Sequence, residues 1–137
     1  MIEARGKTGA VHVLRLTPGE DVRNTLESWI AHNGVQGAVV LGAVGSLRPA
    51  MLRFAGHAEG TLMNEDLEVC TMSGTLAQNG AHLHLIVSDA QGRTMGGHLL
   101  KGSIVRTTLE LALQELDGIT LDRVSDPHTG HAELFPH

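Results

Sequence analysis

The stretch Ala81–Lys101, AHLHLIVSDAQGRTMGGHLLK, decides the fold, because it predicts a β-hairpin. Its first half alternates polar and apolar residues and then continues into β-branched ones, a pattern typical of a strand with one polar face. Side chains alternate across a strand, so His82 and His84 share one face. Gly92 suits the left-handed position that closes a three-residue hairpin loop at 90–92. The chain is therefore expected to turn back on itself after this strand.

The length of the hairpin loop determines whether a third histidine joins the first two. With a loop at 90–92, counting back along both strands places His98 directly opposite His84. Residues in that relation have Cβ atoms about 4.5–5.5 Å apart, and His82 would lie diagonal to the pair. A loop one residue shorter or longer would turn His98 to the other face of the sheet.

Three imidazoles at this spacing predict a metal site. They suit a tetrahedral divalent ion that keeps an open fourth position, as in catalytic zinc centres. The predicted ligands of this zinc-like ion are His82, His84 and His98. Gly96 and Gly97 leave room for a ligand or a second backbone beside the third histidine. The alternative is that the histidines are polar residues on a solvated strand face and the two glycines form a bulge.

Strand patterns and one helical pattern make up most of the remaining chain. Alternation or apolar runs predict strands at 10–16, 36–44, 51–54, 66–76 and 104–113, of which 36–44 is expected to be buried on both faces. A helix is expected to begin after 17–21 and to end at Asn33-Gly34. Its apolar stripe, expected to pack on the sheet, consists of Val22, Leu26, Trp29 and Ile30. We expect an α+β fold with a largely antiparallel central β-sheet of about seven strands and flanking helices.

One acidic residue lies on a strand that would neighbour the hairpin. Alternation along 66–76 predicts one face made of Glu68, Cys70, Met72 and Gly74. Glu68 is the candidate base, able to orient a ligating imidazole or to accept a proton, and no other catalytic residue is indicated. It is equally consistent with a solvent-facing edge charge.

The length and composition of the chain favour some classes of protein and exclude others. The 137 residues predict one domain, with a core at about 10–116 and a C-terminal extended segment at 121–137 whose histidines are expected in a mobile tail. A single cysteine and no apolar leader predict a cytoplasmic protein, and no apolar run approaches the about 20 residues of a membrane span. The net charge of −5 argues against a surface that binds nucleic-acid phosphates. The chain has only two Phe, one Trp and no Tyr, which argues against stacking of bases on aromatic side chains.

A series of short motifs resembles the plants and prokaryotes conserved (PPC) domain family, including its bacterial members. They occur in the family's order and span nearly the whole chain: Thr17–Asp21, Gly45–Leu47, Leu67–Val69, Ser73–Thr75, His82–His84, Gly96–Leu99, Val105–Thr107, and the closing Arg123, Asp126, Thr129-Gly130 and Glu133-Leu134. The most specific are HLH and GGHL.

The resemblance implies a homotrimer and a zinc-like divalent ion held by His82, His84 and His98. It also carries a DNA-binding label. Plant members join the domain to AT-hooks, whose Arg-Gly-Arg-Pro core enters the minor groove, whereas this chain has only Arg5-Gly6-Lys7.

Several functions remain open from the sequence. A trimeric metal-binding module of uncertain biochemical role is the main hypothesis, with a small molecule as its possible ligand. The alternatives are a DNA-associated regulatory protein, a metal-dependent enzyme acting on a small molecule, and an interaction module that trimerises to present a surface. A cupin also shows HxH followed by a later histidine, but Ser88 and Asp89 stand where its glutamate is expected.

Overall fold

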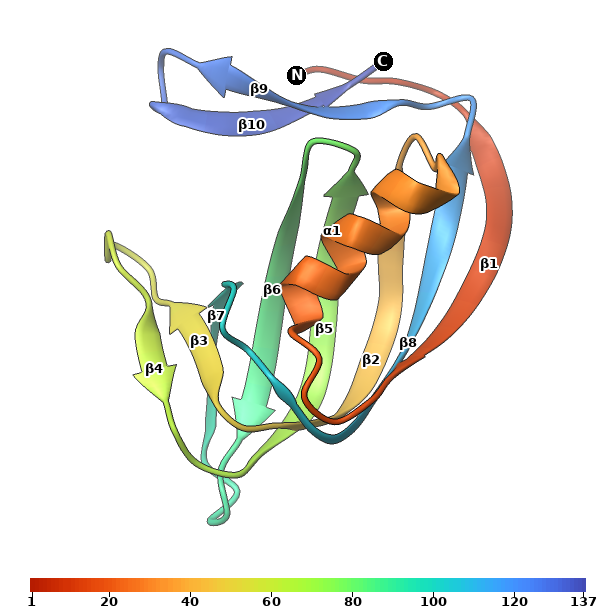
Figure 1. Ribbon diagram of the computed structural model, residues 1–137. Helices are drawn as coiled ribbons and strands as arrows, with labels where there is room; N and C mark the ends of the chain where they lie inside the picture. The colour runs from red at the N-terminus through yellow and green to blue at the C-terminus, as the bar shows by residue number, and fades with distance from the viewer.

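The computed structural model describes residues 1–137 and contains one helix and ten strands (Figure 1). The elements are β1 (Lys7–Leu16), α1 (Val22–Asn33), β2 (Ala38–Leu47), β3 (Ala50–Arg53), β4 (Thr61–Met63), β5 (Leu67–Ala77), β6 (Gly80–Ser88), β7 (Thr94–Leu99), β8 (Val105–Asp117), β9 (Leu121–Asp126) and β10 (His131–Pro136). No helix has both the length and the apolar character that a membrane crossing requires.

The main sheet has eight strands in the order β1-β8-β2-β5-β6-β7-β3-β4, and every pairing in it is antiparallel. A separate hairpin, β9–β10, lies across one end of this sheet (Figure 1). The expected antiparallel sheet with a helix is therefore present. The expectation of several flanking helices is wrong, because there is only one helix. The eight strands of the main sheet agree with the expected number of about seven.

Helix α1 begins and ends where the sequence predicts. The Asp21 carboxylate accepts a hydrogen bond from the Asn24 backbone N–H at 2.9 Å, and Gly34 adopts the left-handed conformation with φ 66° after the last turn. Leu26 and Ile30 are completely buried. The helix covers one face of the sheet over β5 and β6, as expected from its apolar stripe (Figure 1).

The face of the sheet under the helix forms the core, and the opposite face is open. Along β6, Leu83, Leu85 and Val87 are buried, whereas the alternate residues His82 and His84 are exposed. Core burial therefore selects which face the two histidines occupy, because a one-residue slip would bury both and expose three apolar residues.

Two expectations outside the hairpin are corrected. Strand β2 is not buried on both faces, because Leu41 and Val44 on its outer side are 56% and 58% exposed. No layer of this chain covers that side. The C-terminal segment is also not a loose tail, because His131–Pro136 pairs along its whole length with Leu121–Asp126.

Candidate metal centre

The β6–β7 hairpin has the loop and the register that the sequence predicts. The Asp89 N–H donates to the Arg93 carbonyl at 3.0 Å, the Gly92 N–H donates to the Asp89 carbonyl at 2.9 Å, and Gly92 has φ 75°. The buried Asp89 carboxylate also accepts from the Arg93 backbone N–H at 3.0 Å and from its Nε at 2.7 Å, which fixes the loop. The register between β6 and β7 places His84 directly opposite His98.

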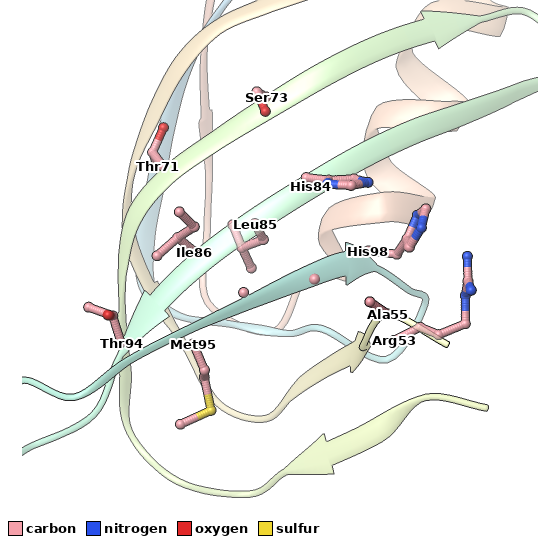
Figure 2. Close-up of a pocket in the computed structure, with 12 residues that line it drawn as sticks. Arg53, Ala55, Thr71, Ser73, His84, Leu85, Ile86, Thr94, Met95 and His98 are labelled. Carbon is pink, nitrogen blue, oxygen red and sulfur yellow. The ribbon is translucent and has the colours of Figure 1, made fainter. Parts of the chain in front are cut away.

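The His84–His98 pair is the middle of a row that crosses four strands. Ser73 of β5 lies opposite His84, and Arg53 of β3 lies opposite His98. Directly opposed residues point to the same face of a sheet. Ser73, His84, His98 and Arg53 therefore emerge side by side on the open face, as Figure 2 shows.

The three imidazoles converge. One ring nitrogen from each of His82, His84 and His98 lies within 4.8 Å of the others, and Nε2 of His82 is 3.2 Å from Nε2 of His84. The ring centroid of His98 is 4.9 Å from that of His82 and 4.4 Å from that of His84. Two nitrogens at about 2.0–2.1 Å from one tetrahedral zinc are about 3.3 Å apart. The donor set and its spacing therefore fit a zinc-like ion.

The surroundings favour the neutral form of two of these imidazoles. Burial, reinforced by the positive charge of Arg53 and the neighbouring rings, lowers the pKa of His98 to about 4. Burial also lowers the pKa of His82, with Arg123 acting in the same direction and Glu133 opposing it. A neutral imidazole has a free lone pair, which is the form that binds a metal ion.

Two cavities open on either side of the three histidines. One, of about 580 Å³, is lined by His84 and His98 together with Arg53 and the Gly96-Gly97 pair (Figure 2). The other, of about 610 Å³, is lined by His82 and His98 together with residues of the β9–β10 hairpin. Ligands of modest size can therefore reach the histidines from both sides.

Gly97 allows β3 to approach the hairpin. A Cβ atom at this position would lie 2.6 Å from the Arg53 carbonyl oxygen, a distance that real Cβ atoms do not show. The second backbone expected beside the glycine pair is thus that of β3. Its approach brings Arg53 to the histidines.

Glu68 is not brought to the histidines. It lies opposite Ser88, four residues along β6 from His84, or about 13 Å at the usual strand rise. The predicted face of β5 is also wrong, because Cys70 is an extra residue in a bulge between Val69 and Thr71. Beyond the bulge the alternation is inverted, so that Met72 is buried and Ser73 lies on the histidine face.

Three polar residues at the site were missed from the sequence: Arg53, Arg123 and Glu133. The Arg53 position depends on the pairing of β3 with β7, strands separated by about forty residues in the chain. The other two belong to the β9–β10 hairpin, whose docking on the sheet has no local sequence signal.

Three of the basic side chains that lie outside the cavities at the histidines are paired with carboxylates. Arg48 and Arg106 both bind the Asp66 carboxylate at 2.9 Å, and Lys101 lies 3.3 Å from that of Glu27.

Comparison with known proteins identifies the family. Residues 3–117 match the model of the Plants and Prokaryotes Conserved (PCC) domain, which covers most of the chain. The chain belongs to this family. Among curated proteins, this PCC domain is similar to two proteins named bifunctional protein GlmU, from Synechococcus sp. strains JA-3-3Ab and JA-2-3B'a(2-13), with 46% and 43% identity over 93% and 90% of the chain. It spans only about a fifth of their length, 21% and 20%.

Three solved structures share the fold of this PCC domain. A hypothetical protein from Salmonella cholerae-suis superimposes with a TM-score of 0.92 at 37% identity, covering 98% of this chain and 96% of that one. A metal-containing protein from Archaeoglobus fulgidus has a TM-score of 0.84 at 25% identity, with 97% and 98% covered. A protein from Ralstonia eutropha named as a candidate DNA-binding protein has a TM-score of 0.75 at 24% identity, with 89% and 88% covered, which shows the common fold.

Proposed function

We propose that this PCC domain binds a divalent, zinc-like cation through His82, His84 and His98. The observation that carries the proposal is the convergence of three imidazole nitrogens within 4.8 Å on the open face of the sheet. An ion held by three imidazoles keeps a free coordination position and supplies Lewis acidity there. The similar protein from Archaeoglobus fulgidus is named as metal-containing, which supports the same chemistry here.

The competing explanation is a polar cluster without a metal. The 3.2 Å separation between Nε2 of His82 and Nε2 of His84 also suits a hydrogen bond, if one ring carries its proton on that nitrogen. The third ring distinguishes the two explanations, because a hydrogen bond between two histidines does not require His98 whereas a tetrahedral site does.

The test is the metal content and metal affinity of protein purified without an affinity tag or chelator. We expect about one zinc or similar ion per chain by elemental analysis, and an increase in melting temperature on adding zinc to stripped protein. His82→Ala, His84→Ala and His98→Ala should each weaken zinc binding at least tenfold, because each removes one of three protein ligands.

His128→Ala is the matched control, because this histidine is exposed on the β9–β10 turn. It should leave the zinc content unchanged. Stoichiometric zinc that survives His98→Ala would contradict the three-histidine site. Absence of zinc from the parent, together with no thermal shift, would leave the histidines as a polar face.

We also propose that the protein is a homotrimer, assembled through the open face of the sheet. Apolar side chains on β1 and β2 are exposed there: Val11 by 55%, Val13 by 80%, Leu41 by 56% and Val44 by 58%. Val13, Leu41 and Val44 line one shallow hollow of this face, and exposed apolar side chains gathered in this way are typical of a protein interface. Three chains of 14.5 kDa should sediment as one species, and Val13→Glu with Leu41→Glu should shift it to the monomer.

A further inference from the structure

Arg53 is placed to contact whatever binds at the three histidines. It lies directly opposite His98 on the neighbouring strand, and its side chain extends alongside the His98 ring (Figure 2). Its guanidinium makes a single long hydrogen bond, from Nη1 to the His57 carbonyl at 3.3 Å, and no ion pair. Most of its donors are therefore available to a ligand.

Arg123 lies on the other side of the histidines. Its Nη2 donates to Oγ1 of Thr75 at 2.7 Å, and Thr75 is directly opposite His82. Its backbone is held to Asn79 by hydrogen bonds of 2.9 and 3.0 Å. Its Nε is buried and has no partner. A buried donor left unsatisfied costs free energy, which a bound acceptor would recover.

The charge around the histidines is unbalanced. Arg23 also lines this region, but each of its three guanidinium nitrogens already donates a hydrogen bond, to the Glu27 carboxylate and to the carbonyls of Leu99 and Ala81. Glu133 is the only carboxylate that lines the cavities at the histidines. A divalent ion placed beside two further guanidinium groups leaves a net positive charge that one carboxylate does not neutralise.

We infer that Arg53 and Arg123 form an anion-recognition pair, and that the ligand of this site is a small molecule carrying a carboxylate or phosphate group. The inference rests on the proposed metal site, because the ion supplies the third positive group. Guanidinium donors form a planar fork that matches both anions, and such charge-assisted hydrogen bonds are strong. Cavities of about 580 and 610 Å³ accommodate a small organic acid or phosphate ester.

The experiment measures anion binding to the zinc-loaded full chain after its zinc content has been determined. Inorganic phosphate and malonate are titrated separately by calorimetry at constant ionic strength in a weakly coordinating buffer. Arg53→Gln should weaken the affinity for the preferred anion about tenfold or more and leave the zinc content unchanged. Arg123→Gln should act in the same direction, but Arg53 provides the decisive variant because Arg123 also anchors β9 through Thr75.

Arg5→Gln is the matched control, because it removes one positive charge from an exposed residue near the N-terminus. It should change the affinity less than twofold. Cobalt-loaded protein supplies a second readout. Its visible spectrum should shift on adding the anion, and Arg53→Gln should require a correspondingly higher anion concentration for the same shift.

The outcomes separate this inference from the metal site itself. Stoichiometric zinc with no binding of phosphate or malonate below about 10 mM would overturn the anion site and leave the metal site standing. Equal affinities in the Arg53→Gln and Arg5→Gln variants would also overturn it. Failure of the parent to take up zinc would defeat the proposed function, and the anion inference with it.

Discussion

Replacing Gly97 by alanine tests whether close approach of β3 to β7 positions the site. The added Cβ would lie 2.6 Å from the Arg53 carbonyl oxygen, whereas ordinary contact begins at 3.4 Å, so the two strands must separate by about 0.8 Å. The register between β3 and β7 is short: it comprises Leu52 with Leu99 and Arg53 with His98, followed by a hydrogen bond of 3.0 Å from the Leu100 N–H to the Met51 carbonyl. Overpacking of this kind costs about 1–3 kcal/mol, and we expect Gly97→Ala to lower the free energy of unfolding by that amount.

Urea denaturation gives the free energy of unfolding, and elemental analysis and calorimetry give zinc content and phosphate affinity. The zinc content should be retained, because β6 and β7 carry all three histidines and their own register is unaffected. The phosphate affinity should fall, because Arg53 moves with β3. Gly42→Ala is the control, since a Cβ there meets no atom within 4 Å, and its effect should stay within about 0.5 kcal/mol.

Equal stability of Gly97→Ala and Gly42→Ala would show that close packing of β3 on Gly97 does not limit the fold. Loss of zinc from Gly97→Ala with unchanged phosphate affinity would show that the histidines depend on β3 and that phosphate binding does not.

Three further predictions concern the cap of the helix, the core beneath the histidines and the effect of pH on the free energy of unfolding. Asp21→Ala removes the cap of α1 and the acceptor of the Gly102 N–H at 2.6 Å, and should cost about 1–3 kcal/mol in urea denaturation. Leu85→Ala, at a side chain only 1% exposed beneath the histidines, should cost about 2–5 kcal/mol. The pKa of His98, lowered to about 4 by burial and by Arg53, implies that the unfolded chain binds more protons between pH 6.5 and 4. The metal-free protein should therefore lose stability as the pH falls through that window, as measured by urea denaturation at pH 7 and 5.

Each of these predictions has a paired variant. Asp21→Asn keeps the capping oxygen and should cost less than Asp21→Ala. Ile86→Ala, on the exposed side of the same strand as Leu85, should cost less than Leu85→Ala. His98→Gln should reduce the loss of stability between pH 7 and 5, and an unchanged loss would show that other groups cause it.

The histidine hairpin could be read from the sequence because every step in it is local. His82, His84 and His98 lie within 17 residues of one another on two strands joined by a three-residue loop, and the alternation of buried leucines selects their face. Helix α1 could also be predicted from the sequence, since its cap, its apolar stripe and its terminal glycine are all encoded in consecutive residues.

The inverted side-chain alternation in the second half of β5 could not be predicted from the sequence. A bulge adds one residue and changes the face of everything after it, and nothing in the run 66–76 marks Cys70 as that residue. Glu68 precedes the bulge, and it was misplaced for a different reason: it pairs with Ser88, which lies four residues along β6 from His84, and the length of that offset depends on the register between two strands.

The sequence by itself therefore determined the antiparallel hairpin, the register of the three histidines and the helix that covers the core, because short-range pairing and side-chain periodicity specify them. Only the tertiary structure decided which charged groups surround the histidines. Arg53 arrives through pairing between distant strands, and Arg123 and Glu133 arrive when the β9–β10 hairpin docks on the sheet. Such long-range contacts depend on the packing of the whole chain, which no local pattern encodes.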